Sequence, residues 1–414
     1  MDNLEADHLF RHHYGKMVAV LTRIFGFEHL ELIEDAIQDT FIKALKTWRS
    51  HYPENPQAWL TTAAKNRILD LFRKLSSEKK RNTFFANGSS VIAIDELFLD
   101  SEIEDSQLRM IFTACHPDLD TRDQIAFALK TISGFSIKEI ASALLLKDET
   151  VKKRLIRARK AIQESGLIFE IPQGKALTVR LQNVLAVVYL LFNEGFHSSS
   201  ANSIIQKDLC AEAIRLAQLL LKNTTTRTPN GYALFALMCF HAARLDSKID
   251  ENGEIIDLKH QDRSTWYFPL IKLGNDAMNK AVITSEFSTY HYEAAIASEH
   301  LKAKTFEETD WNKIISWYKQ LCIISPSPIN ILNQATAQLQ LSNKKEALSL
   351  LNQMNPKKLQ HRTYLYLGAM CEYYLLENDI EKSLRYIDDA LAMVKTDTEK
   401  NYLLKKRRLI LSNL

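Results

Sequence analysis

The stretch from Ser136 to Ile162 constrains the fold most strongly, because it predicts two short helices joined by a tight turn. Ser136 and Glu139 have the spacing of a capping box, in which each side chain satisfies a free backbone N–H at a helix start. Apolar side chains of the second helix recur at helical spacing: Val151, Leu155, Ala158 and Ile162. We therefore expect a helix-turn-helix whose second helix buries a single stripe.

The remaining face of this second helix is strongly basic. It carries six cations: Lys152, Lys153, Arg154, Arg157, Arg159 and Lys160. Residues 106–163 hold 11 Lys and Arg against 6 Asp and Glu, so the basic excess of the chain centres on this motif. A helix that enters a DNA major groove needs this division into an apolar stripe and a cationic face. Ordinary surface helices also have it, so the motif alone leaves DNA binding and a plain surface role equally open.

Composition supports a helical protein of several domains. The chain has 414 residues, of which 46% are hydrophobic, and only 11 are Gly and 9 are Pro. Enough apolar side chains for substantial cores, with few helix-breaking residues, favour helices over sheets. We expect an all-α, multidomain fold.

Cysteine usage and hydropathy predict the compartment. The five cysteines lack C-x-x-C spacing, as expected for reduced thiols in a cytoplasmic protein: Cys115, Cys210, Cys239, Cys322 and Cys371. The acidic, polar N-terminus is unlike a signal peptide. The longest apolar run, Val184–Phe192, is too short to span a bilayer. The sequence therefore predicts a soluble, cytoplasmic protein without membrane contact.

Two N-terminal helices have polar faces that are candidate binding surfaces. The first, about residues 30–48, buries an apolar stripe and presents Asp35, Gln38 and Asp39 together on its other face. The second spans residues 59–74 and carries 4 cations against 1 anion. Its outer face holds Lys65, Asn66, Arg67, Asp70, Arg73 and Lys74. Such side chains hydrogen-bond base edges and phosphates, although a polar helix face more often simply meets water.

Two motifs in this order resemble region 2 of bacterial extracytoplasmic-function sigma factors. They are DAIQDTF (Asp35–Phe41) and NPQAWLTTAAKNRILDLFRK (Asn55–Lys74), and the helix-turn-helix then resembles region 4 of the same family. Three later segments resemble the extension of one subgroup, in which a helical, tetratricopeptide-like domain follows region 4. They are RLQNVLAVVYLLFNEGF, HQDRSTW and TDWNKIISWYKQLCIISPSPINILNQA. The resemblance thus covers nearly the whole chain.

The resemblance implies a role for each surface. Asp35, Gln38 and Asp39 would bind the coiled-coil clamp of core RNA polymerase. The helix over residues 59–74 would face the −10 promoter element, and the basic helix would read the −35 element. The implied DNA-binding residues are Lys65, Asn66, Arg67, Asp70, Arg73, Lys74, Thr150, Lys152, Lys153, Arg154 and Arg157. The implied function is an alternative sigma factor that directs transcription initiation, with no enzyme chemistry, cofactor or metal.

The resemblance and the charge pattern together give an expected domain order. It comprises region 2 over residues 1–74, an acidic linker over 75–105, region 4 over 106–165, a helical extension over 178–290 and tetratricopeptide-like repeats over 291–414. Ala347 and Ser383, small residues 36 positions apart in two similar helices, indicate the repeats. Ordinary helical packing is the alternative for that part. The extension would be a built-in regulator, with a regulatory protein or ligand as its partner.

Two other functions stay open from the residues alone. One is a helix-turn-helix DNA-binding regulator that does not join polymerase. The other is a scaffold or enzyme whose function lies in the C-terminal half. HQDRSTW (His260–Trp266) is the catalytic-looking segment of that half, but no nucleophile or metal cluster accompanies it. Hydrogen bonding within the fold is therefore the favoured role for this segment.

Overall fold

The structure is a computed structural model that describes residues 3–48, 52–78, 100–144, 146–167, 169–196, 203–251, 254–394 and 396–412. Every regular element in these ranges is a helix, and the strand-like pairing there is an isolated antiparallel bridge between Ile249 and Ile255. The predicted all-α class is therefore confirmed for this part of the chain. Most of the expected acidic linker, residues 79–99, lies outside the described residues.

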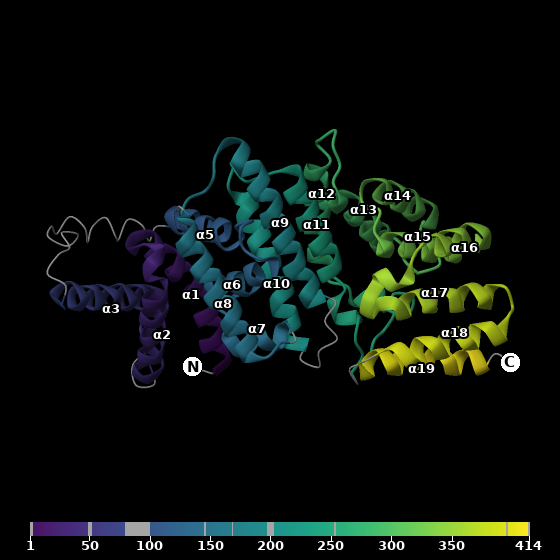
Figure 1. Cartoon of the computed structure of the whole chain (residues 1–414), viewed down its shortest axis with the longest axis horizontal. Coiled ribbons are helices and arrows are strands. Elements are labelled where there is room, and N and C mark those ends of the chain that lie inside the picture. Colours follow the sequence, from purple (N-terminus) through teal and green to yellow (C-terminus); the bar gives the residue numbers. More distant parts are fainter. Residues whose placement is uncertain are drawn as a thin grey trace. The chain divides into compact units, whose positions relative to one another are not determined.

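The chain divides into two compact units, residues 1–194 and 195–414, whose helices are labelled in Figure 1. Unit 1 contains α1 (Asn3–Phe25), α2 (Leu30–Thr47), α3 (Pro56–Glu78), α5 (Asp100–Ala114), α6 (Thr121–Thr131), α7 (Ile137–Ala143), α8 (Asp148–Ser165) and most of α9 (Gly174–Phe196). Unit 2 contains α10 (Ser203–Lys222), α11 (Pro229–Ala242), α12 (Phe268–Ala281), α13 (Thr289–Lys302), α14 (Trp311–Ile324), α15 (Pro328–Gln340), α16 (Lys344–Gln353), α17 (Thr363–Leu376), α18 (Ile380–Met393) and α19 (Asp397–Ser412).

The predicted helix-turn-helix is formed by α7 and α8. Ser136 caps α7 in a reciprocal capping box with Glu139, at 3.2 and 2.8 Å. α8 begins at Asp148 and ends at Ser165, and the next residue, Gly166, has the left-handed φ of 62° that suits a glycine after a helix. The expected stripe is buried, with each member at most 3% exposed: Val151, Leu155, Ala158 and Ile162. Local pattern and packing therefore agree throughout this motif.

α9 is the described helix whose length and apolar composition would suffice to cross a membrane. It is longer than the apolar run in the sequence, because polar residues continue the helix at both ends. Arg180 and Asn183 donate hydrogen bonds to the main-chain carbonyls of Phe112 and Cys115 at the end of α5. Its apolar side is buried at Leu181, Val184, Leu185, Val188, Leu191 and Phe192. The two hydrogen bonds therefore join α9 to α5 of unit 1, and the burial of its apolar side identifies a packed helix.

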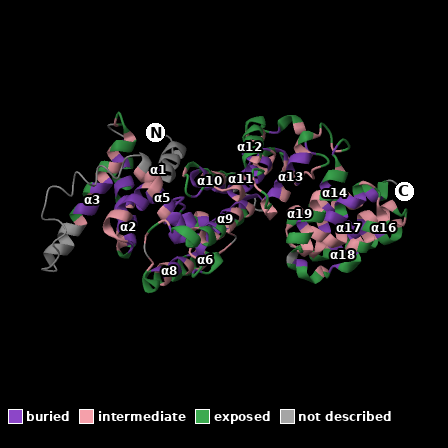
Figure 2. Ribbon diagram, turned by 90° about the horizontal axis from the view of Figure 1, so that it is seen from above, coloured by how far each residue is buried: buried purple, intermediate pink, exposed green. Residues whose placement is uncertain are grey.

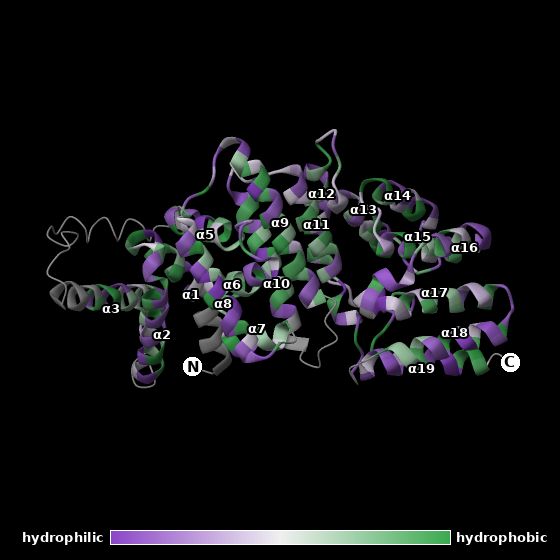
Figure 3. Ribbon diagram, viewed as in Figure 1, coloured by the Kyte–Doolittle hydropathy of each residue, from purple (hydrophilic) through white to green (hydrophobic). Residues whose placement is uncertain are grey.

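The first part of unit 2 is organised around α11, which is apolar along almost its whole length (Figure 3). It packs against α10, α12 and α13. At Gly274 in α12 the approach is so close that an added Cβ would lie 2.5 Å from the ring of Phe240. A helix without a polar face is expected at the centre of a bundle, as found here.

The last helices form the repeats that the sequence indicates. Ser342 and Asn378, 36 positions apart, end α15 and α17 with the same left-handed φ of 57°. In both turns the next residue closes a hydrogen bond five positions back, at 3.0 and 2.9 Å. Ala347 and Ser383 are fully buried in the following helices, α16 and α18. α17, α18 and α19 lie side by side, with buried and exposed faces that differ in colour in Figure 2. The equivalence supports tetratricopeptide-like helix pairs.

Candidate nucleic-acid interface

α2 separates an apolar side from an acidic side. Ile33, Ile37 and Ala44 are at most 1% exposed, whereas Asp35 and Asp39 are exposed. This follows from the helical period, which places residues two positions apart on different sides. The two carboxylates therefore form the accessible part of the predicted docking face.

Gln38, the third residue of that face, is half-buried and hydrogen-bonds the Tyr14 side chain. The Tyr14 hydroxyl also donates to Glu34 Oε1 at 3.1 Å. Burial, followed by the neighbouring Glu34 carboxylate, raises the pKa of Tyr14 well above its ordinary value. Tyr14 is therefore a neutral donor, and Gln38 belongs partly to the interior of unit 1.

α3 presents the second predicted surface. Asn55 caps its start by accepting a hydrogen bond from the Ala58 N–H at 3.0 Å. Asn66 and Asp70 are exposed, while Lys65 is only 8% exposed and is thus the least accessible of the predicted DNA-binding residues described here. The side chains of Arg73 and Lys74 lie outside the described residues.

An ion pair joins the two predicted surfaces. Arg67 Nη2 of α3 lies 2.8 Å from Asp39 Oδ2 of α2, with both side chains about half exposed. Exposed pairs of this kind contribute about 0–1 kcal/mol, so a polymerase or DNA group can compete for either partner. This pair could not be predicted from the sequence, because the two residues are 28 positions apart and lie on different helices.

The outer face of α8 is cationic and open within unit 1. Lys152, Lys153 and Arg157 are exposed, and Thr150 and Arg154 are partly exposed. Lys152 pairs with Glu149 at 2.8 Å within the helix, so this acid partly offsets the positive charge at the start of α8. Lys153 has no ion pair within the described ranges and is exposed, so its ammonium group is accessible to a DNA phosphate.

Arg157 is held more firmly than the other cations of α8. Its Nε and Nη2 donate to the two oxygens of Asp123 at 2.9 and 2.7 Å, and Asp123 is 5% exposed. A two-pronged pair with a buried carboxylate fixes the guanidinium in one orientation. Arg157 thus ties α8 to α6, while the other side of its guanidinium faces solvent.

Arg159 is a residue whose role the sequence missed. The basic pattern placed it on the open face, but it turns inward and pairs with Glu34 of α2, which is 3% exposed. Glu31 lies 3.7 Å from the same guanidinium. Arg159 lies at the edge of the buried stripe, directly after Ala158. Its inward position depends on Glu34 of α2, which the local sequence does not reveal.

Further contacts hold α1 against α5 and α6, the two helices that precede the helix-turn-helix. Lys130 Nζ of α6 lies 5.2 Å from the centroid of the Tyr14 ring. A Cβ added to Gly15 would lie 1.8 Å from the Ile132 carbonyl oxygen, so glycine is required at this crossing. Arg23 of α1 pairs with Glu102 and Asp105 of α5 at 2.8 and 3.1 Å. Two of the acidic residues assigned to the linker therefore lie on a packed helix.

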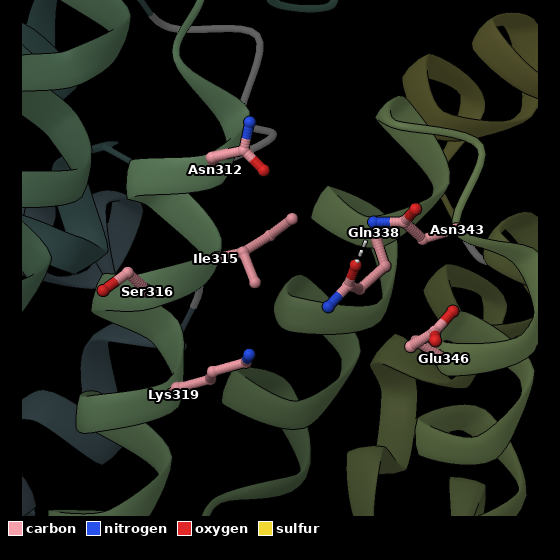
Figure 4. Close-up of a pocket in the computed structure, with 7 residues that line it drawn as sticks. All are labelled: Asn312, Ile315, Ser316, Lys319, Gln338, Asn343 and Glu346. Atoms are coloured by element: carbon pink, nitrogen blue, oxygen red, sulfur yellow. Dashed lines mark hydrogen bonds between the residues drawn. The ribbon is translucent and has the colours of Figure 1, made fainter.

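A polar pocket of about 340 Å³ lies in the repeats of unit 2. Figure 4 shows its walls, which come from α14, α15 and the start of α16: Asn312, Ile315, Ser316, Lys319, Gln338, Asn343 and Glu346. Asn343 donates to the Gln338 amide oxygen at 2.8 Å. Amide groups beside one cation and one anion suit the main chain and polar side chains of a peptide.

Three family models match successive parts of the chain. Residues 9–78 match the family model Sigma-70 region 2, and residues 109–162 match Sigma-70, region 4. Residues 180–282 match a family of unknown function, DUF6596. The last match covers α9 and the first bundle of unit 2. No solved structure matches the chain.

Three relatives illustrate the extent of the similarity. The uncharacterized protein R00370 of Rhizobium meliloti is 32% identical over 346 residues, which cover 80% of this chain and 79% of that protein. The ECF RNA polymerase sigma factor SigE of Mycolicibacterium smegmatis is 25% identical over 38% of this chain and 60% of its own length. The ferric citrate uptake sigma factor FecI of Escherichia coli is 27% identical over 42% of this chain and 94% of its own length.

Proposed function

The chain belongs to the extracytoplasmic-function sigma factors, in a form that carries a C-terminal helical extension, and we propose how its surfaces divide the work. It is a promoter-recognition factor that binds core RNA polymerase and promoter DNA. Families of this kind are initiation factors rather than enzymes. The site of action that we propose is the cytoplasm, where polymerase and DNA meet.

The exposed carboxylates Asp35 and Asp39, with Gln38 beside them, dock on the clamp of core polymerase. Their placement on the side of α2 opposite its buried stripe supports this assignment. Arg67 of α3 lies 2.8 Å from Asp39, so the docking face and the α3 surface adjoin each other. We assign −10 contact and strand separation to the α3 set of Lys65, Asn66, Arg67, Asp70, Arg73 and Lys74.

α8 enters the −35 major groove. One observation supports this assignment above all. α8 has a fully buried apolar stripe and an exposed cationic face, and it follows the capped helix α7. Lys152, Lys153 and Arg154 contact phosphates or bases together with Thr150. Arg157, oriented by Asp123, adds a fixed guanidinium at the edge of this face.

The extension acts as a built-in regulator whose partner docks on the repeats. The pocket between α14, α15 and α16 supports this, because its amides and its opposed Lys319 and Glu346 suit a peptide segment of a regulatory protein. An extended peptide would exchange its main-chain hydrogen bonds with the pocket amides. We propose that the domains expected from the sequence, in that order, have the functions that the resemblance implies.

Transcription in vitro tests the proposed function. Core polymerase, the full chain and a pool of genomic fragments should yield transcripts whose start sites share two upstream elements. Replacing Lys153 and Arg154 with Ala should reduce these transcripts while leaving co-elution with core polymerase intact. A chain that binds DNA but never co-elutes with core polymerase would contradict the proposal.

A further inference from the structure

Three cations gather around two aromatic rings in unit 2. Lys248 Nζ lies 3.6 Å from the centroid of the Phe196 ring, and the Arg244 guanidinium carbon lies 5.2 Å from it. The Arg263 guanidinium carbon lies 4.9 Å from the Trp266 ring. We call Arg244, Lys248 and Arg263 the cationic cluster. Ring faces attract cations but remove no positive charge.

Two short 3₁₀ helices place the cluster, η3 (Leu245–Ser247) and η4 (Arg263–Thr265). Trp266 Nε1 donates to Ser247 Oγ at 2.9 Å, and Ser247 Oγ donates to Gln261 Oε1 at 3.3 Å. This network fixes the HQDRSTW segment against the end of α11. The segment thus has the structural hydrogen bonds expected of it, and it also holds Arg263 in the cluster.

Each cation of the cluster donates to neutral oxygen atoms. Arg263 Nη1 donates to the carbonyl oxygens of His300 and Ala303 at 2.6 and 2.8 Å. Lys248 Nζ donates to a main-chain carbonyl at the end of α9, and Arg244 Nη1 makes one long bond of 3.4 Å to an amide oxygen. Within the described ranges of the chain, none of the three forms an ion pair with a carboxylate.

The charge of the cluster is therefore poorly compensated. Burial, with repulsion from Arg244, lowers the pKa of Lys248 to about 8. Burial alone lowers the pKa of Arg244 to about 10. Glu307 and Glu308 act on Arg263, but from beyond ion-pair distance. Concentrated positive charge that is partly buried is costly unless an anion accompanies it.

Two buried nitrogen atoms beside the cluster lack hydrogen-bond partners in the described part of the chain, which indicates a site for a ligand. Arg263 Nη2 and His300 Nδ1 are buried and have no hydrogen-bond partner within the described residues. Buried polar groups nearly always have a partner, which is often a bound water or ion. His300 is close enough to Arg244 and Arg263 for both to lower its pKa, so all three belong to one neighbourhood.

We propose that the cationic cluster is a binding site for a small, multiply charged oxyanion of the phosphate class. Two planar guanidinium forks and one ammonium group form the donor set that recognises phosphate oxygens. Arg244, Lys248 and Arg263 are each partly exposed, so the cluster lies near the surface of unit 2. The site lies in the extension and depends on no part of the proposed promoter reading.

Isothermal titration calorimetry of the full chain with inorganic phosphate tests the site directly. We expect saturable binding and a rise in the melting temperature that sodium chloride at equal ionic strength does not reproduce. Malonate serves as the carboxylate arm and should bind at least tenfold more weakly. Absence of phosphate binding would overturn the proposal, and malonate binding as tight as phosphate would overturn the assigned class.

Matched variants locate the binding. Arg244→Gln and Lys248→Met should each weaken phosphate binding at least tenfold while circular dichroism stays unchanged. Lys259→Met, which removes an exposed cation of the same segment, should leave the affinity unchanged. If either cluster variant unfolds, Arg244→Lys keeps the charge, loses the planar fork and should still bind more weakly. Unchanged affinity in the folded cluster variants would place the anion elsewhere and overturn the assignment.

Discussion

Arg159 shows how one side chain of α8 serves the fold rather than the DNA surface. Its partner Glu34 is 3% exposed, so Arg159→Ala would leave a buried carboxylate without its cation. We expect the free energy of unfolding to fall by about 3 kcal/mol, because unpaired buried charge is strongly destabilising. Urea unfolding followed by circular dichroism measures the change.

The neighbouring cation provides the control for that prediction. Lys160 has a side chain that is 71% exposed, and its weak pair with Glu164 spans 3.6 Å. Lys160→Ala should change stability by less than about 0.5 kcal/mol, as is usual for exposed surface positions. Equal effects of the two substitutions would mean that the Arg159–Glu34 contact contributes little to unit 1.

His300 makes the stability of unit 2 depend on pH. Burial first, then Arg244 and Arg263, lowers its pKa from 6.5 to about 3. Between these values the unfolded chain binds more protons than the folded chain, so stability falls as the pH decreases from about 6.5 towards 3. His300→Gln should remove about 2–3 kcal/mol of the loss seen between pH 7 and 4.5 in phosphate-free buffer. An identical acid-induced loss in the variant would contradict this.

The docking face is a property of the whole α2 helix, because its buried side determines which residues face outward. Reversing the charge of Asp35 and Asp39 to Lys should reduce co-elution with core polymerase at least tenfold. The change also places a cation next to Arg67, so circular dichroism must show that α2 and α3 remain folded. Glu54→Lys, an exposed reversal in the preceding loop of α3, is the control and should co-elute normally.

The salt dependence of DNA binding tests the α8 face. Lys153 and Arg154 have no carboxylate partner within the described residues, so their replacement by Ala leaves no acid unpaired. Each lost phosphate contact should lower the slope of log affinity against log salt by about 0.9. Arg157→Ala is a poorer test, because it also leaves the Asp123 carboxylate without its ion-pair partner. An unchanged slope in the double variant would mean that Lys153 and Arg154 do not contact DNA phosphates.

Element-scale patterns explain why part of the fold was predictable. The capping box at Ser136 and the stripe from Val151 to Ile162 are set within a few residues, so the sequence predicts α7 and α8. The inward turn of Arg159 and the pairing of Arg67 with Asp39 depend on a second helix far along the chain. The cationic cluster was likewise hidden, because Arg263 comes from a different segment than Arg244 and Lys248, and only the tertiary fold brings the two segments together.

At the scale of the whole molecule, unit 1 extends beyond the helix-turn-helix. Most of α9 belongs to it, and Arg180 and Asn183 donate hydrogen bonds to carbonyls at the end of α5. The family match over residues 180–282 crosses the boundary between the units, so a sequence family does not coincide with a structural unit here. The carbonyls that α9 caps lie about 70 residues upstream, which no local pattern reveals.

Truncation at the two ends of α9 tests whether unit 1 needs this helix to fold. A chain that ends after Phe196 keeps every α9 contact within unit 1, and it should fold and still direct core polymerase to promoters. A chain that ends at Gln173 loses six buried apolar side chains of α9 and uncovers the carbonyls of Phe112 and Cys115. Each such loss costs about 1–3 kcal/mol, more in sum than a domain of this size can spare. Limited proteolysis and thermal melting of the two chains should therefore differ sharply, and equal resistance would remove α9 from the core of unit 1.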